Sequence, residues 1–137
     1  MKKSLKKLEI PTFHDTRGDL SAIELKDYVS WVPKRVYYVT NVTEDRGGHA
    51  VVGEEKLYVC MQGTMTARFH DGKEWQEFEL QGPQDAVLMS GLYFREFKNF
   101  SPGAVLMAIS NMNYEKDKYI YDFEAFLQQS QIDLVTE

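Results

Sequence analysis

The sequence predicts an all-β domain of the sandwich or jelly-roll barrel type, followed by a short C-terminal helix. Three observations lead to this prediction. Short β-branched and aromatic stretches recur at the roughly eight-to-twelve-residue spacing typical of such folds, separated by glycine- or proline-containing turns. Asp71-Gly72 is a strong signal for a hairpin turn. After residue 117 the apolar spacing becomes helical, with Asp122 as a candidate N-cap.

The expected elements follow from alternation and turn chemistry along the chain. Strands 8–13 and 20–25 flank a polar turn and should form a hairpin. In the most β-branched stretch, period-2 alternation places Arg35 and Tyr37 on one face. The helix should end near Leu127, leaving residues 130–137 as a frayed tail. The remaining expected strands are 35–42, 49–52, 56–61, 64–70, 75–80, 86–89, 93–97 and 104–109.

Composition bounds the class of protein. The 137 residues suit one domain, 1–137, and 43% apolar with 27% charged residues is neither a disordered nor a membrane composition. No apolar run approaches the ~18 residues of a membrane span, and the basic N-terminus lacks the apolar segment of a secretory signal, so we expect a cytoplasmic protein. A net charge of −5 argues against nucleic-acid binding.

The one cysteine and the three histidines restrict the chemistry further. Cys60 lies in an apolar strand, where a core thiol is the simpler interpretation and no internal disulfide can form. A zinc site of the Cys/His type is not expected. His14 sits in a turn and His70 on an outward strand face, so we expect both to be structural.

The stretch Arg46-Gly47-Gly48-His49-Ala50-Val51 brings a titratable side chain to the start of a strand. Two glycines allow positive φ or a close backbone approach between Arg46 and His49. Histidine, with an unperturbed pKa near 6.5, is the side chain best suited to act as a base at neutral pH. His49 is therefore the candidate catalytic base.

Several motifs in fixed order resemble one family over the stretch from Ile10 to about Leu127. The sequence is similar to the WxcM-like/FdtA-type sugar 3,4-ketoisomerases, small cupins that act on TDP-4-keto-6-deoxy-D-glucose. The motifs are Asp15-Thr16-Arg17-Gly18-Asp19-Leu20, Lys34-Arg35-Val36-Tyr37-Tyr38, Arg46-Gly47-Gly48-His49-Ala50, Asp71-Gly72-Lys73, Arg95-Glu96 with Asn99-Phe100-Ser101, and the acidic and aromatic segment Tyr114 to Phe126.

The resemblance implies a cupin jelly-roll barrel that moves a carbonyl from C4 to C3 of a dTDP-linked hexose. It implies no metal, no redox cofactor, a homodimer, and a role in deoxyamino-sugar biosynthesis of the O-antigen and lipopolysaccharide type. We favour the galacto configuration for the product. On this interpretation His49 and Tyr37 transfer protons, and the substrate-binding residues are Arg35, Arg46, Arg17, Arg95 and Tyr93.

One position departs from the family pattern. The family's loop continues His-Ala-His, whereas this chain has Val51 at the third position, which carries no proton. Residues two apart share a strand face, so Val51 should lie beside His49 where a second imidazole would be. Any proton transfer by that imidazole must therefore pass to another group, to water, or to His49 itself.

Three alternatives remain open. The chain could be a deoxysugar epimerase, which also abstracts a proton beside a ketone, although no clear His–Asp dyad is visible. It could be a cupin that binds sugar nucleotides without catalysis, because the second histidine is Val51. A metal-dependent cupin oxygenase is a further, weaker interpretation, since only His49 with Glu54 or Glu55 is available as ligands.

Overall fold

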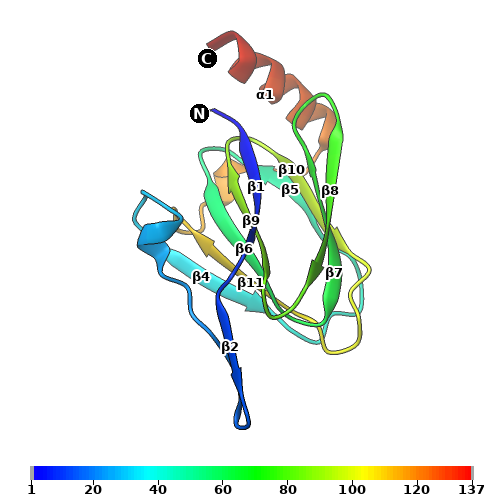
Figure 1. The fold of residues 1–137 in the computed structure, drawn as a ribbon. Helices are drawn as coiled ribbons and strands as arrows, with labels where there is room; N and C mark the ends of the chain where they lie inside the picture. Colours follow the sequence, from blue (N-terminus) through cyan, green and yellow to red (C-terminus); the bar gives the residue numbers. More distant parts are fainter. Residues whose placement is uncertain (1, 137) are drawn as a thin grey trace.

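Two five-stranded antiparallel sheets form the walls of a barrel in the computed structural model, which describes residues 2–136 (Figure 1). The first sheet has the order β1 (Ser4–Glu9), β9 (Asp85–Ser90), β6 (Glu55–Gln62), β11 (Val105–Ser110) and β4 (Arg35–Val39). The second has the order β12 (Tyr119–Ile120), β5 (Arg46–Val51), β10 (Phe94–Lys98), β7 (Thr64–His70) and β8 (Trp75–Gln81). The predicted all-β barrel with a C-terminal helix is confirmed.

The main core lies between the two sheets. Its aromatic centre joins Tyr58 of β6 to Phe97 of β10, with ring centroids 4.8 Å apart, and to Phe69 of β7 at 6.0 Å. Cys60 is fully buried in the same cluster, as the apolar strand predicted. Alternation in β4 also holds, because Val36 and Tyr38 are exposed while Arg35 and Tyr37 turn toward the interior.

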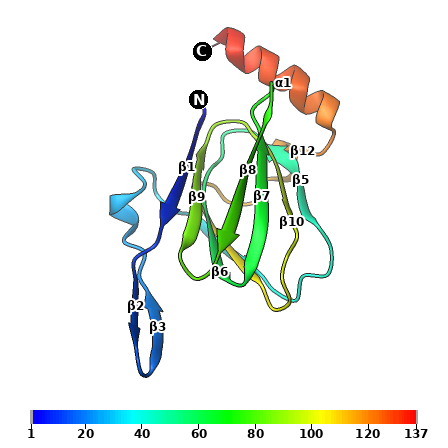
Figure 2. The ribbon, with the colours of Figure 1, turned by 45° about the vertical axis from the view of Figure 1, so that its right-hand side comes forward.

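The N-terminal hairpin is shorter than predicted and projects from the barrel (Figure 2). It pairs β2 (Thr12–Asp15) with β3 (Gly18–Ser21), rather than residues 8–13 with 20–25. Leu8 belongs instead to β1, which pairs with β9. Strands β1 and β2 are separated at Pro11, which has no N–H to donate to a sheet.

The C-terminal helix α1 (Phe123–Thr136) is longer than predicted and begins at the expected cap, where the Ala125 amide donates to Asp122 Oδ2 over 3.1 Å. The tail prediction is wrong for Ser130, which is buried on the helix and receives a hydrogen bond from Lys3 Nζ at 2.8 Å. Glu137, the last residue of that predicted tail, lies outside the described residues.

His70 is also placed differently from the prediction of an outward face. It is buried because helix α1 covers it, with the His70 ring 5.0 Å from those of Trp75 and Phe123. Its Nδ1 accepts the Gly72 amide at 3.0 Å, so its role is structural, as expected. Short 3₁₀ turns at Leu25–Asp27 and Lys116–Lys118 complete the elements. Within residues 2–136, no helix has the length and apolar character that a membrane crossing requires.

Candidate active site

A cavity of about 360 Å³ opens between the two sheets. Strands from both sheets supply its polar lining. Arg35 and Tyr37 come from β4, and His49 comes from β5 with Arg95 beside it on β10. The full lining is Arg35, Tyr37, Tyr38, Val39, Arg46, Gly47, His49, Tyr58, Arg95, Phe97, Leu106 and Tyr119. Three guanidinium groups therefore meet one imidazole around a space suited to an anionic ligand.

The glycine pair forms part of strand β5, although the sequence predicted a loop up to Gly48. The pairing with β10 shifts register here, because Arg95 faces His49 while the next residue, Glu96, faces Gly47. A Cβ on Gly47 would lie 2.7 Å from the Arg95 carbonyl oxygen, and its φ is +89°. Glycine is required because β10 passes against the backbone, and this irregularity sets where His49 enters the cavity.

His49 is held in a largely buried aromatic setting. Its ring lies 5.1 Å from that of Tyr119 and 5.9 Å from that of Tyr121. Burial lowers the pKa of His49 to about 4, with the charges of Arg95 and Lys56 acting in the same direction. The imidazole is therefore neutral at pH 7 and has a free lone pair with which to accept a proton.

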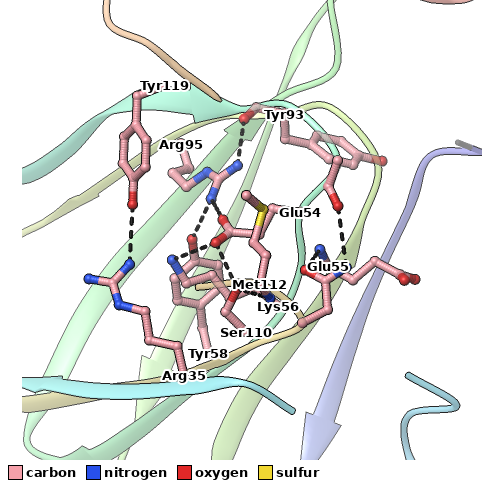
Figure 3. A network of polar contacts seen from close by, with 12 residues as sticks. Arg35, Glu54, Glu55, Lys56, Tyr58, Tyr93, Arg95, Ser110, Met112 and Tyr119 are labelled. Atoms are coloured by element: carbon pink, nitrogen blue, oxygen red, sulfur yellow. Dashed lines mark hydrogen bonds and ion pairs between the residues drawn. The ribbon is translucent and has the colours of Figure 1, made fainter. Parts of the chain in front are cut away.

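A buried ion pair lies behind the cavity (Figure 3). Arg95 Nη1 donates to Glu54 Oε1 at 2.5 Å and to the Tyr58 hydroxyl at 3.0 Å. The Arg95 Nη2 group donates to the Tyr93 carbonyl oxygen at 3.3 Å. Burial opposes ionisation of Glu54, but the charges of Arg95 and Lys56 outweigh it, and the pKa of Glu54 falls below its usual value. Glu54 is thus a carboxylate at neutral pH.

Lys56 joins this pair from the first residues of β6. Its Nζ lies 3.4 Å from Glu54 Oε2, and both side chains are almost fully buried. The same oxygen accepts a hydrogen bond from Ser110 Oγ at 2.9 Å. Burial lowers the pKa of Lys56 to about 8, even though the Glu54 carboxylate favours the charged form. Lys56 is therefore a cation that can lose its proton near neutral pH.

Arg35 and Tyr37 form the opposite wall. The Arg35 guanidinium donates to the Tyr119 hydroxyl at 3.3 Å and lies 5.0 Å from the Tyr37 ring and 5.3 Å from the Tyr114 ring. These rings fix the guanidinium over the cavity. Burial raises the pKa of Tyr37 to about 12, so its hydroxyl stays protonated and can donate a hydrogen bond to a substrate oxygen.

The structure brings together five of the seven residues singled out from the sequence: Arg35, Tyr37, Arg46, His49 and Arg95. Arg17 lies elsewhere, at the tip of the projecting hairpin, where it pairs with Asp15 over 2.7 Å. Tyr93 is buried in the main core, edge-on to Phe69 at 6.3 Å, and does not line the cavity. Arg95 does line it, although Glu54 and Tyr58 occupy one of its terminal nitrogens.

Three residues around the cavity were missed or misplaced by sequence reasoning. Glu54 was considered only as a metal ligand, and Lys56 and Tyr119 were not considered. A signal for Lys56 exists, because alternation puts it on the same inward face as Tyr58 and Cys60. A lysine on a buried face calls for a partner, and Glu54 lies two residues earlier. No comparable signal marks Tyr119, which depends on the short pairing of β12 with β5.

Val51 is buried on the same strand as His49 and lies opposite Tyr119 in the β5–β12 pairing. An aliphatic side chain therefore occupies the position two residues after the candidate base. Among residues 2–136, no cluster of three or more His, Cys, Asp or Glu side chains is arranged to hold a metal ion.

Comparison with known proteins identifies the family. The family model for the WxcM-like, C-terminal domain, FdtA, matches residues 3–131. The chain belongs to this family. A TDP-4-oxo-6-deoxy-alpha-D-glucose-3,4-oxoisomerase from Aneurinibacillus thermoaerophilus is 32% identical over 114 residues, which cover 82% of this chain and 82% of the relative.

Solved structures of FdtA-like ketoisomerases share the fold. The sugar 3,4-ketoisomerase QdtA from Thermoanaerobacterium thermosaccharolyticum, in complex with TDP, has a TM-score of 0.86 and 25% identity, covering 94% of this chain and 96% of that one. The TDP-quinovose 3,4-ketoisomerase WlaRB from Campylobacter jejuni has a TM-score of 0.81 and 32% identity, covering 90% and 97%. The similarity therefore extends over nearly the whole chain.

The buried ion pair makes a prediction about stability. Glu54→Gln keeps the shape of the side chain but removes the charge that balances Arg95 and Lys56. We expect the free energy of unfolding at pH 7 to fall by roughly 3–5 kcal/mol, the usual cost of leaving a buried charge without its partner. Urea unfolding followed by circular dichroism measures this change.

The neighbouring carboxylate provides the matched control. Glu55 is half-buried and accepts a hydrogen bond from Ser90 Oγ at 2.9 Å, but it forms no ion pair with a buried cation among the described residues. Glu55→Gln should cost about 1 kcal/mol or less, as for an ordinary hydrogen bond. An equal effect of the two substitutions would contradict the importance assigned to the Glu54 ion pair.

Proposed function

We propose that this chain is a sugar 3,4-ketoisomerase that converts dTDP-4-keto-6-deoxy-D-glucose to a dTDP-3-keto-6-deoxyhexose. The observation that carries the proposal is a neutral, inward-facing His49 in a cavity lined by Arg35, Arg46 and Arg95. The reaction needs a group that accepts a proton and surroundings that favour an anionic intermediate. A base that is uncharged at pH 7 and a positively charged cavity wall provide these. Membership of the FdtA family supports the same substrate class.

The reaction would proceed by proton abstraction next to a ketone. His49 removes the C3 proton, which the C4 carbonyl acidifies, and an enediolate forms. A proton then returns to C4, and a second proton passes between the oxygens to leave a ketone at C3. Positive charge on Arg95 and Lys56 favours the anionic intermediate over the neutral ketone. No electron acceptor is needed, because oxidation at C3 balances reduction at C4.

Tyr37 is the proposed hydrogen-bond donor at the sugar oxygens. Its protonated hydroxyl belongs to the cavity wall, and the pKa of about 12 makes it a donor across the working pH range. With Val51 unable to carry a proton, we assign the return of the proton at C4 to His49 itself, or to water positioned with Tyr37. We propose that this proton is delivered to the face of C4 that gives the galacto product.

The diphosphate would bind to Arg35 and Arg46, because guanidinium groups form paired hydrogen bonds with phosphate oxygens. Arg46 is exposed at the start of β5, and Arg35 is oriented by Tyr37 and Tyr114. Arg95 is buried and its role is electrostatic. Arg17 and Tyr93 lie outside the cavity wall, so neither is assigned to a substrate contact within this chain.

Proton NMR with TDP-4-keto-6-deoxyglucose in D₂O tests this function directly. We expect a 3-keto sugar with deuterium at C4, whose coupling constants give the C4 configuration. Deuterium at C3 or C5 with the ketone still at C4 would instead indicate an epimerase. Binding of TDP-sugar without exchange would indicate a cupin that no longer catalyses.

Two matched substitutions then assign the base. His49→Asn should lower kcat by at least ~100-fold, the contribution usual for a positioned general base, with little change in thermal stability. His14→Asn makes the same change on the exposed hairpin and should leave kcat unaltered. Comparable activity in the two variants would exclude His49 as the base.

We further propose that the protein forms a homodimer. Strand β4 is an edge of the first sheet, and its outward Val36 and Tyr38 are 60% and 71% exposed. Phe13 and Leu20 are similarly exposed on the projecting hairpin. Exposed apolar side chains beside an open sheet edge are typical of surfaces covered by a second subunit.

Light scattering coupled to size exclusion tests the oligomeric state. We expect a mass about twice the 15.9 kDa of the chain, and a shift toward monomer in Val36→Lys, because a buried charge weakens an apolar interface. The control is Lys116→Ala, a change on the 3₁₀ turn after β11, which should not alter the mass. A monomeric wild type at micromolar concentration would contradict the proposal.

A further inference from the structure

The buried layer behind the cavity has more positive than negative charge. Arg95 and Lys56 are both cations, and Glu54 is the carboxylate that faces them. All three side chains are at most 2% exposed. Because buried charge is costly unless it is paired, one carboxylate shared by two cations leaves a positive field that reaches into the cavity.

Neither cation has all of its N–H donors engaged, because Arg95 Nε is buried with no hydrogen-bond partner among the described residues. Arg95 has the short contact to Glu54 and further bonds to Tyr58 and the Tyr93 carbonyl. Among the described residues, the oxygen within ion-pair distance of Lys56 Nζ is Glu54 Oε2 at 3.4 Å, which Ser110 also engages. An ammonium has three N–H donors, so Lys56 keeps unspent hydrogen-bonding capacity in a buried position.

The sheet register places this ammonium against the cavity wall. Lys56, Ser110 and Arg35 lie in one row across β6, β11 and β4, and the next row contains Tyr58, Ala108 and Tyr37. The Lys56 Nζ atom is 4.6 Å from the centre of the Tyr37 ring and 5.3 Å from that of Tyr58. Two aromatic rings of the cavity lining, Tyr37 and Tyr58, thus lie next to the Lys56 charge.

We propose that Lys56 is a positioning residue for the proposed ketoisomerase reaction: its ammonium, held by Glu54 beside Tyr37, disfavours positive charge on His49 in the free enzyme and stabilises the enediolate when it forms. The second part of this inference, stabilisation of the enediolate, rests on the proposed ketoisomerase function. Val51, two residues after His49 on β5, offers neither charge nor proton to the reacting sugar.

The pH dependence follows from the groups that face Lys56. These are Glu54 in the preceding turn, Tyr58 on β6, Arg35 and Tyr37 on β4, Arg95 on β10 and, through its own lowered pKa, His49 on β5. The role requires protonated Lys56, whose pKa is about 8. Its effect is therefore present below that pH and is lost as pH rises through it, so kcat/KM should fall above pH 8.

Two substitutions separate charge from shape. Lys56→Met removes the charge and leaves Glu54 paired with Arg95, so the chain should still fold. We expect its kcat/KM at pH 7 to fall by at least ~10-fold, and the decline above pH 8 to disappear. Lys56→Arg retains a charge that does not titrate in this range. It should keep kcat/KM within about tenfold of the wild type and show no decline near pH 8.

A readout without substrate tests the first half of the proposal. The NMR titration of His49, assigned by the signal missing in His49→Asn, gives its pKa in the wild type and in Lys56→Met. We expect the pKa of His49 to rise by at least about half a unit when the neighbouring positive charge is removed. It should stay at the wild-type value in Lys56→Arg.

These measurements distinguish the two proposals. An unchanged His49 pKa in Lys56→Met, or a decline near pH 8 that persists in both variants, would overturn the role of Lys56 even if the wild type isomerises the sugar. A wild type that does not isomerise the sugar, together with a raised His49 pKa in Lys56→Met, would overturn the ketoisomerase function and keep the charge effect on His49.

Discussion

The ion pair between Glu54 and Arg95 is the interaction on which the site depends. It connects the turn before β6 in the first sheet with β10 in the second; Ser110 also donates to Glu54, and Tyr58 also accepts from Arg95. Arg95 in turn lies opposite His49 in the β5–β10 pairing. One buried contact therefore ties the two walls of the barrel together and sets the electrostatic surroundings of the candidate base.

Such a pair contributes little net stability to a fold, because the desolvation of two charges offsets much of their attraction. An apolar cluster of similar volume would hold the sheets as well. The arrangement has an electrostatic consequence that an apolar cluster would lack. With Lys56 added, it provides a fixed positive field beside a cavity in which an anionic intermediate would form.

The sequence predicted the features that depend on local pattern. Alternation placed Arg35 and Tyr37 inward on β4, the glycine pair marked the site of His49, and Asp122 marked the start of α1. The errors concern long-range contacts. Ser130 is buried because Lys3 and the carbonyl of Asp71 meet it, although each lies far away in the sequence.

The same limit applies to the site. Arg95 was assigned to substrate binding from its motif, but the buried carboxylate that engages it comes from Glu54, 41 residues earlier. Tyr119 reaches the cavity through a two-residue strand, which is too short to show an alternation pattern from which its pairing could be predicted. Lys56 could have been found, because a charged side chain in the inward alternation of an apolar strand requires a compensating partner.

The central claim is that burial and the positive layer around Glu54, Arg95 and Lys56 keep His49 neutral and ready to accept a proton. Its most direct test is an NMR titration of His49 in the wild-type protein without ligand, from pH 8 down to pH 5. The structure predicts a neutral imidazole throughout, because the pKa of His49 is lowered to about 4. A midpoint at or above the ordinary value of about 6.5 would contradict the account.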